Sequence, residues 1–277
     1  MLTRRGPGGS PEFPLQELQD SPQFNEQTIP KNFSCSHCLL SRVAEADLRV
    51  FQVIHSELGR RTDDTGLRTR HSTHEDLCDP RRMALLVYDM QVGILSQIKN
   101  GAEITTRVLK VLGAARESGI RVIFSRHMSL PKELMGVFQM RMAMAWQRVE
   151  TVEEVKPWFI RDSPGFQLIP ELSPRPTEAI FDKITMSAFE GTPLNIVLRD
   201  CGVNVFAIVG VAMEVGIEPT VRHAADLGYI PVIVHNACGA GHEEAGERSI
   251  ACVKYSGDAV FTDVETICKV LTGRRQH

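Results

Sequence analysis

From residue 83 onward, short apolar runs alternate with longer segments that carry apolar residues at helical spacing. Near-continuous apolar runs are typical of strands buried on both faces of a parallel sheet, and amphipathic segments are typical of helices that cover it. The pattern predicts strands at 83–90, 121–127, 178–183, 203–211, 230–237 and 258–262, and helices at 102–118, about 133–148, 192–201, 215–228, 242–254 and 263–272. This alternation predicts a doubly wound α/β domain, in which a parallel sheet lies between two layers of helices.

The first 80 residues differ in composition from the rest of the chain. Residues 1–32 are rich in Pro, Gly, Ser and Gln and contain few large apolar residues, so we expect them to be disordered. Residues 39–58 carry apolar residues near helical spacing and predict one amphipathic helix, which a charged linker follows. We therefore expect a largely disordered extension over 1–80 and one α/β domain over 81–277.

Composition and charge exclude several classes of function. The formal net charge of −3 comes without a basic stripe, which argues against nucleic-acid binding. No apolar run approaches the roughly 18 residues needed to span a bilayer, so we expect no membrane association. The seven cysteines are an odd number, which suits reduced thiols and a cytoplasmic protein. The chain also lacks a GxGxxG motif after the first strand and a P-loop motif, and we expect no cofactor.

Polar groups stand at the carboxyl ends of three predicted strands. Asp89 lies near the end of the first predicted strand, Lys183 ends the third, and the turn at 210–216 begins at the end of the fourth. Ligands bind at this edge in open α/β sheets, so these groups are candidates for one site. A carboxylate and an ammonium that converge on a pocket shift each other's pKa and can share proton transfer. The alternatives are a helix cap for Asp89 and a surface salt bridge for Lys183.

Three ordered motifs carry a resemblance to a known family. They are LLVYDMQVGIL at 85–95, FDKITMSAFEGTPLNIVLRDCGVN at 181–204 and AIVGVAMEVGIEPTVRHAADLGYIPVIVHNACGA at 207–240. Together they resemble the isochorismatase-like hydrolase superfamily, also called the cysteine hydrolases, in register from about 84 to 272. The resemblance implies a three-layer α/β/α domain with a six-stranded parallel sheet, a small-molecule substrate, and a homodimer or homotetramer.

The resemblance also assigns site residues. The catalytic acid of the family falls on Asp89 and its lysine on Lys183, whereas the nucleophilic cysteine falls at Gly216, which has no side chain. In the amidase members, that thiolate attacks an amide carbonyl and backbone N–H groups bind the oxyanion. The peptide between Val211 and Ala212 matches the place of a cis bond that helps to form the oxyanion hole.

The pocket residues are expected from the same resemblance. Nicotinamidases bind a metal through an acid and two histidines after the second strand, but His127 is the only histidine in that segment here, so we expect no metal. His127 is a candidate for hydrogen bonding in the pocket or for a structural role, and Phe189 matches a position that lines the pocket. Cys238 could be a displaced nucleophile, although a buried apolar role is favoured.

Three functional hypotheses follow. The first is an enzyme that needs no thiol, because the isochorismatases proper carry glycine at the cysteine position and cleave a vinyl ether. Asp89 would then be the general acid, with its protonation set by Lys183. The second is a non-catalytic relative that keeps the pocket for binding. The third is an amidase-type cysteine hydrolase in which Gly216 replaces the natural cysteine.

Overall fold

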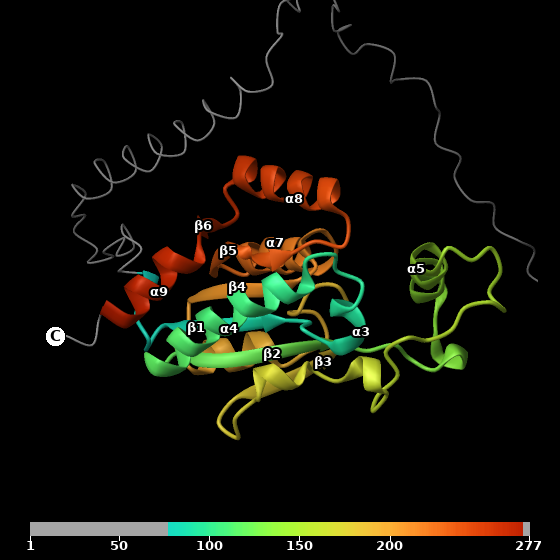
Figure 1. The fold of residues 1–277 in the computed structure, drawn as a ribbon, viewed down its shortest axis with the longest axis horizontal. Helices are drawn as coiled ribbons and strands as arrows, with labels where there is room; N and C mark the ends of the chain where they lie inside the picture. The colour runs from blue at the N-terminus through green and yellow to red at the C-terminus, as the bar shows by residue number, and fades with distance from the viewer. Residues whose placement is uncertain (1–76, 274–277) are drawn as a thin grey trace, which may run out of the picture. The chain divides into compact units, whose positions relative to one another are not determined.

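A computed structural model of the chain describes residues 77–273. The helix predicted at 39–58 and most of the predicted extension lie outside the described residues. The described part contains six strands in one parallel sheet of order β3-β2-β1-β4-β5-β6, which confirms the predicted fold class (Figure 1). The strands are β1 (Met83–Tyr88), β2 (Arg121–His127), β3 (Ala179–Lys183), β4 (Val205–Val211), β5 (Ile230–Gly239) and β6 (Val260–Thr262).

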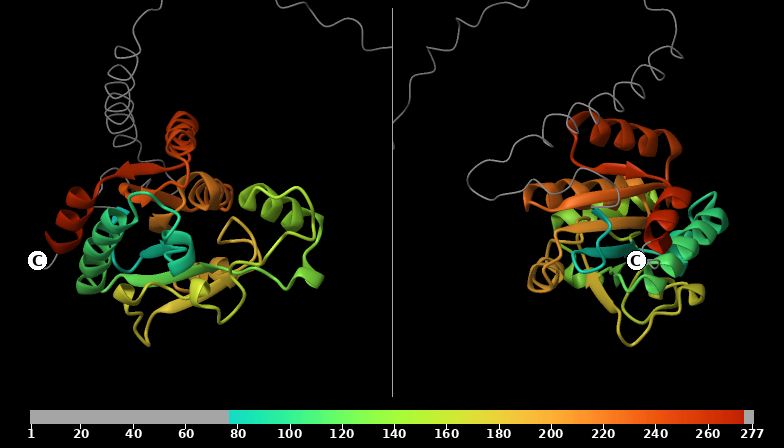
Figure 2. Two further views of the ribbon diagram at one scale, coloured as in Figure 1. Left: turned by 45° about the vertical axis from the view of Figure 1, so that its right-hand side comes forward. Right: turned by 90° about the vertical axis from the view of Figure 1, so that its left-hand side faces the viewer.

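Helices cover both faces of the sheet, and each face has its own hydrophobic core. The helices α4 (Gly101–Glu117) and α9 (Val264–Gly273) lie side by side on one face, as Figure 1 and the left view of Figure 2 show. The helices α6 (Leu194–Asp200), α7 (Glu218–Asp226) and α8 (Glu243–Ser256) contribute to the core on the other face. No helix among residues 77–273 combines the length and hydrophobicity needed to cross a membrane.

The two central strands position the site. Every residue of β1 and β4 is buried, as expected for apolar strands covered on both faces. The chain places β2 on one side of β1 and β4 on the other, so the strand order reverses between β1 and β4. Ligands bind outside the carboxyl ends of the strands at such a reversal point. The two predicted strand ends, at Asp89 and at 210–216, lie there.

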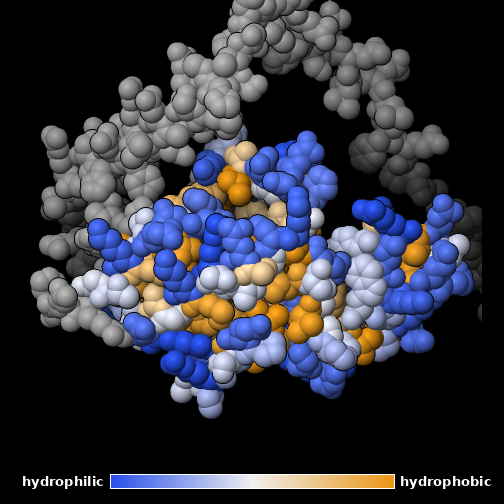
Figure 3. All heavy atoms as spheres, in the orientation of Figure 1, coloured by the Kyte–Doolittle hydropathy of each residue, from blue (hydrophilic) through white to orange (hydrophobic). Residues whose placement is uncertain are grey.

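The helix α5 (Val137–Gln147) lies beyond the carboxyl end of β2 (Figures 1 and 2). It buries only Ala143 among its residues, whereas Val137 and Phe138 are exposed, and Figure 3 shows hydrophobic residues among hydrophilic ones on this lobe. It is shorter than the predicted segment because a separate turn, η1 (Lys132–Leu134), precedes Gly136. The short elements α3 (Val92–Leu95), η2 (Pro164–Phe166) and η3 (Pro170–Leu172) were not predicted.

Candidate active site

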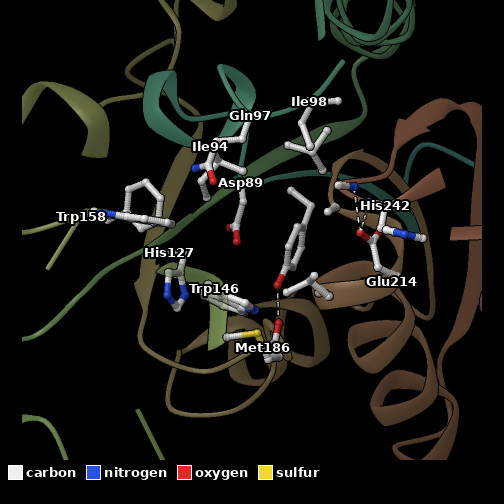
Figure 4. Close-up of a pocket in the computed structure, with 17 residues that line it drawn as sticks. Asp89, Ile94, Gln97, Ile98, His127, Trp146, Trp158, Met186, Glu214 and His242 are labelled. Carbon is white, nitrogen blue, oxygen red and sulfur yellow. Dashed lines mark hydrogen bonds between the residues drawn. The ribbon is translucent and has the colours of Figure 1, made fainter. Parts of the chain in front are cut away.

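A cavity of about 390 Å³ opens at the reversal point of the sheet. Figure 4 shows Asp89, His127, Trp146 and Trp158 around one side of it and Glu214 and His242 on the other. Its lining comes from the ends of β1, β2 and β4, from α3 and α5, from the turn at 213–217 after β4, and from the loops after α3, β3 and β5 and around Trp158. The lining residues are Tyr88, Asp89, Ile94, Gln97, Ile98, His127, Trp146, Trp158, Phe159, Met186, Val211, Ala212, Glu214, Val215, Gly216, Gly241 and His242.

A buried ion pair joins Asp89 and Lys183 at one end of this cavity. The Nζ atom of Lys183 donates to Oδ2 of Asp89 at 2.7 Å, and the hydroxyl of Ser125 donates to Oδ1 at 2.6 Å. Neighbouring strands supply the three residues, because β3, β2 and β1 are adjacent in the sheet. Asp89 has a φ of 46°, a backbone conformation that non-glycine residues rarely adopt and that is concentrated at functional sites. The structure therefore brings the predicted acid and lysine together.

The surroundings of Lys183 favour transfer of a proton from its ammonium group to Asp89. Its side chain is 1% exposed, and its ammonium also donates to the carbonyl of Thr185 at 3.2 Å and lies 4.4 Å from the ring centre of Tyr88. Burial lowers the pKa of Lys183 from its ordinary value, while the charge of Asp89 opposes that shift. A lysine with a lowered pKa, hydrogen-bonded to a carboxylate, can pass a proton to that carboxylate.

Tyr88 occupies the space beside Gly216. A Cβ atom built at Gly216 would lie 2.5 Å from the Cε1 and Cζ atoms of Tyr88, far inside van der Waals contact. The phenol donates to the carbonyl of Met186, and its pKa is raised well above its ordinary value, first by burial and then by the charge of Asp89. The phenol therefore stays protonated, and its ring fills the volume that a side chain at the predicted nucleophile position would need.

The turn after β4 forms the wall around Gly216. A short π-helix, η4 (Met213–Ile217), leads directly into α7, and π-helical turns are frequent at functional sites. The peptide bond between Val211 and Ala212 is cis, as the sequence resemblance implies, and both residues line the cavity. The N–H of Gly216 donates to the carbonyl of Ala212 at 3.0 Å, which closes this turn.

His127 lies on the same side of the cavity as Asp89. The fully buried amide of Gln91 bonds both backbone groups of His127, at 2.6 and 3.0 Å, and thereby fixes the end of β2. Burial, and next the charge of Lys183, lowers the pKa of His127 to about 4, so the ring is neutral near pH 7. Its Nδ1 atom is buried and has no hydrogen-bond partner among the described residues.

Two further candidates from the sequence, Phe189 and Cys238, do not line the cavity in the described part of the chain. Phe189 is not one of the lining residues in the described part of the chain; it packs in the core against Phe206 and Tyr229, at ring-centre distances of 5.8 and 5.4 Å. Cys238 is also outside the lining within residues 77–273, and burial raises the pKa of its thiol to about 12. Cys238 therefore lacks the thiolate that a nucleophile requires at neutral pH.

Other site residues were not found from the sequence. Ser125 is a polar residue within an apolar strand, and Tyr88 is an aromatic residue with a hydroxyl directly before Asp89; both signals were available. Trp158 and Phe159 follow α5 in an irregular segment, whose path over the cavity no periodic pattern reveals. Among residues 77–273, no group of three or more His, Cys, Asp or Glu side chains is placed to hold a metal ion.

The sheet order defines a doubly wound α/β protein, and its cavity and buried carboxylate–lysine pair lie at the strand-order reversal, where ligands bind in such folds. Residues 83–266 match the isochorismatase domain, and the chain belongs to the isochorismatase family, which is part of a hydrolase superfamily.

Solved structures show the same fold. A cysteine hydrolase from Pseudomonas syringae pv. phaseolicola 1448A is 23% identical, with 71% of this chain and 95% of that chain covered and a TM-score of 0.61. An isochorismatase family protein from Desulfovibrio vulgaris subsp. vulgaris str. Hildenborough is 22% identical, with 69% and 99% covered and a TM-score of 0.59. N-carbamoylsarcosine amidase from Thermoplasma acidophilum is 19% identical, with 66% and 96% covered and a TM-score of 0.54.

Proposed function

We propose that this protein is a hydrolase that cleaves an acid-labile bond, of the vinyl ether type, in a small molecule without a thiol nucleophile. The observation that carries the proposal is the 2.7 Å ion pair between Asp89 and Lys183, which lies at the cavity beside a position that has no side chain. Such a pair holds a transferable proton in a site shielded from water, and general acid catalysis of this kind contributes about 10² to 10⁴ in rate.

The proposed reaction begins with protonation of the substrate. The proton that Lys183 shares with Asp89 passes through Oδ2 to the terminal carbon of the vinyl ether, whose π electrons form the new C–H bond. The adjacent oxygen stabilises the resulting cation. Water then adds to that cation, a proton returns to the pair, and the hemiketal breaks its C–O bond to release a carbonyl compound and an alcohol. The protein ends the cycle in its starting state.

Two observations favour the thiol-free reaction: the position of Tyr88 argues against an amidase, and the buried ion pair argues against a binding protein. The hypothesis that Gly216 replaces the natural cysteine of an amidase is disfavoured, because Tyr88 fills the space that the cysteine would need. Close packing of this ring against Gly216 is instead expected if the site is built without a side chain at position 216. A binding protein without catalysis has no need of a buried ion pair, whose desolvation is costly. The buried pair therefore favours the enzyme over the binding protein.

The test is a turnover assay on matched substrate classes. The neutral vinyl ether α-methoxystyrene, isochorismate, benzamide and nicotinamide are each incubated with the wild-type protein, with Asp89→Asn, and with wild-type protein alkylated by iodoacetamide. We expect turnover of a vinyl ether that survives alkylation and falls at least about 100-fold in Asp89→Asn. Asparagine keeps the size of the side chain and removes the acid.

Other outcomes reject the proposal. Amide turnover by the wild-type protein that alkylation abolishes would identify a thiol enzyme. Amide turnover that appears only in Gly216→Cys, alone or with Tyr88→Val, would indicate a lost nucleophile. Saturable binding of these compounds without turnover of any of them would favour the binding protein.

A further inference from the structure

We infer that the substrate presents a planar group to this cavity and carries no negative charge. This inference rests on the proposed function, since it names the class of molecule that the same site accepts. Two properties of the lining carry it: the charges of its side chains and an aromatic wall.

The first property is charge. The acidic side chains of the lining are Asp89 and Glu214, and the described residues contribute no Lys or Arg to it. The ammonium of Lys183 lies behind the lining, where Asp89, a carbonyl and a ring face already surround it. His127 is neutral near pH 7, because its pKa lies at about 4. An anion in this cavity would meet the negative charge of Glu214, because Lys183 is already paired with Asp89 and no Lys or Arg of the described residues lines the cavity, so a dicarboxylate such as isochorismate fits poorly.

The carboxylate of Glu214 is held in place by two backbone hydrogen bonds. Its Oε1 atom accepts the backbone N–H groups of Gly241 and His242, each at 2.8 Å, so it ties η4 to the loop before α8. Figure 4 shows Glu214 and His242 together on the side opposite Trp158. The carboxylate is therefore held in a fixed position behind the cavity surface, with Oε2 buried, and its charge repels an anion in the cavity without contacting it.

The second property is an aromatic wall formed by Trp146, Trp158 and Phe159. His127 meets Trp146 and Phe159 edge to face, with ring centres 6.1 and 6.0 Å apart, and Trp158 meets Phe159 at 6.2 Å. Each tryptophan is 38% exposed and lines the cavity, so part of each ring remains open to a ligand. Such faces attract planar groups and cations, and repel anions.

A set of three ligands with the same ring tests the inference. Benzylamine is cationic, benzamide is neutral, and benzoate is anionic. The chain contains two tryptophans, Trp146 and Trp158, and both line the cavity, so intrinsic tryptophan fluorescence reports directly on binding. We expect benzylamine and benzamide to quench it saturably and benzoate to bind at least about tenfold more weakly. Benzoate that binds as tightly as either of the others would overturn the inference.

Two variants test whether the charge of Glu214 causes the preference for benzylamine over benzoate. Glu214→Gln keeps an acceptor oxygen for the loop and removes the charge, so we expect it to narrow the difference between benzylamine and benzoate severalfold. Glu218→Gln is the matched control, since Glu218 lies in the next helical turn, outside the lining in the described part of the chain, and pairs with Arg222. An equal effect of both variants would contradict the role of Glu214.

The binding test is separate from the test of catalysis. A protein that binds benzamide and benzylamine but hydrolyses no vinyl ether would reject the proposed function and leave the ligand class standing. A protein that hydrolyses α-methoxystyrene but binds benzoate as well as benzylamine would reject the ligand class alone.

Discussion

Tyr88 packs directly against Gly216, and its ring fills the space that any side chain at 216 would need. Tyr88 is 1% exposed and Gly216 is buried, so the contact lies in the packed interior. The absence of a side chain at 216 is therefore part of the packing of this site. A glycine that had simply lost its cysteine would leave a void, because interiors relax only partly around a deleted side chain.

The first prediction tests this complementarity. Gly216→Cys forces Tyr88 to move, and overpacking of this kind costs about 1–3 kcal/mol of unfolding free energy, measured by urea denaturation. Introduced into a Tyr88→Val background, the same cysteine meets open space and should cost less. Gly113→Cys is the control, because a Cβ at Gly113 meets no atom within 4 Å. An equal loss of unfolding free energy from Gly216→Cys in both backgrounds would show that contact with Tyr88 is not the cause of that loss.

The second prediction concerns the buried ion pair. Lys183→Met leaves the carboxylate of Asp89 buried without its cation, and removal of one partner of a buried pair costs about 3–5 kcal/mol of unfolding free energy. Lys110→Met is the matched control: Lys110 pairs with Glu265 at 3.4 Å, but both side chains are more than half exposed. That change should cost less than about 1 kcal/mol. Similar losses in the two variants would mean that the Asp89–Lys183 pair contributes no more than a surface contact.

The third prediction concerns pH. The pKa of His127 is about 4 in the folded protein, below its value in the unfolded chain, so the unfolded chain binds more protons between those values. Stability is therefore fully present above the unfolded pKa and falls as the pH drops toward 4. Between pH 7 and pH 5 this loss amounts to about 2 kcal/mol.

The variant His127→Gln isolates that loss, because it removes the titrating ring and keeps a polar side chain. We expect denaturation curves at pH 7 and pH 5 to differ less in the variant than in the wild-type protein. If both proteins lose the same stability over this interval, protonation of His127 is not its cause, and other groups that titrate there must carry it.

The sequence predicted the parts of the site that depend on strand ends. Asp89 and Lys183 stand at the ends of apolar runs, and parallel strands bring their carboxyl ends to one edge, so periodicity placed both residues at that edge; their contact depends on the strand order, which the pattern does not give. Tyr88 lies within the strand predicted at 83–90, and an apolar run does not reveal which residue of a strand borders the cavity. The path of the chain from α5 to β3 is irregular, so no pattern could place Trp158 there. Phe189 was expected in the pocket from the resemblance, whereas its contacts lie with Phe206 and Tyr229 in the core.

The origin of the transferred proton tests the central claim most directly. Hydrolysis of α-methoxystyrene in D₂O by a carbon-protonating acid places one deuterium in the methyl group of the product acetophenone, which mass spectrometry counts. After subtraction of the uncatalysed rate, we expect one deuterium per product molecule with the wild-type protein, and formation at least about 100-fold slower with Asp89→Asn. Enzyme-dependent product without deuterium in its methyl group, or an undiminished rate with Asp89→Asn, would contradict hydrolysis initiated by the Asp89–Lys183 pair.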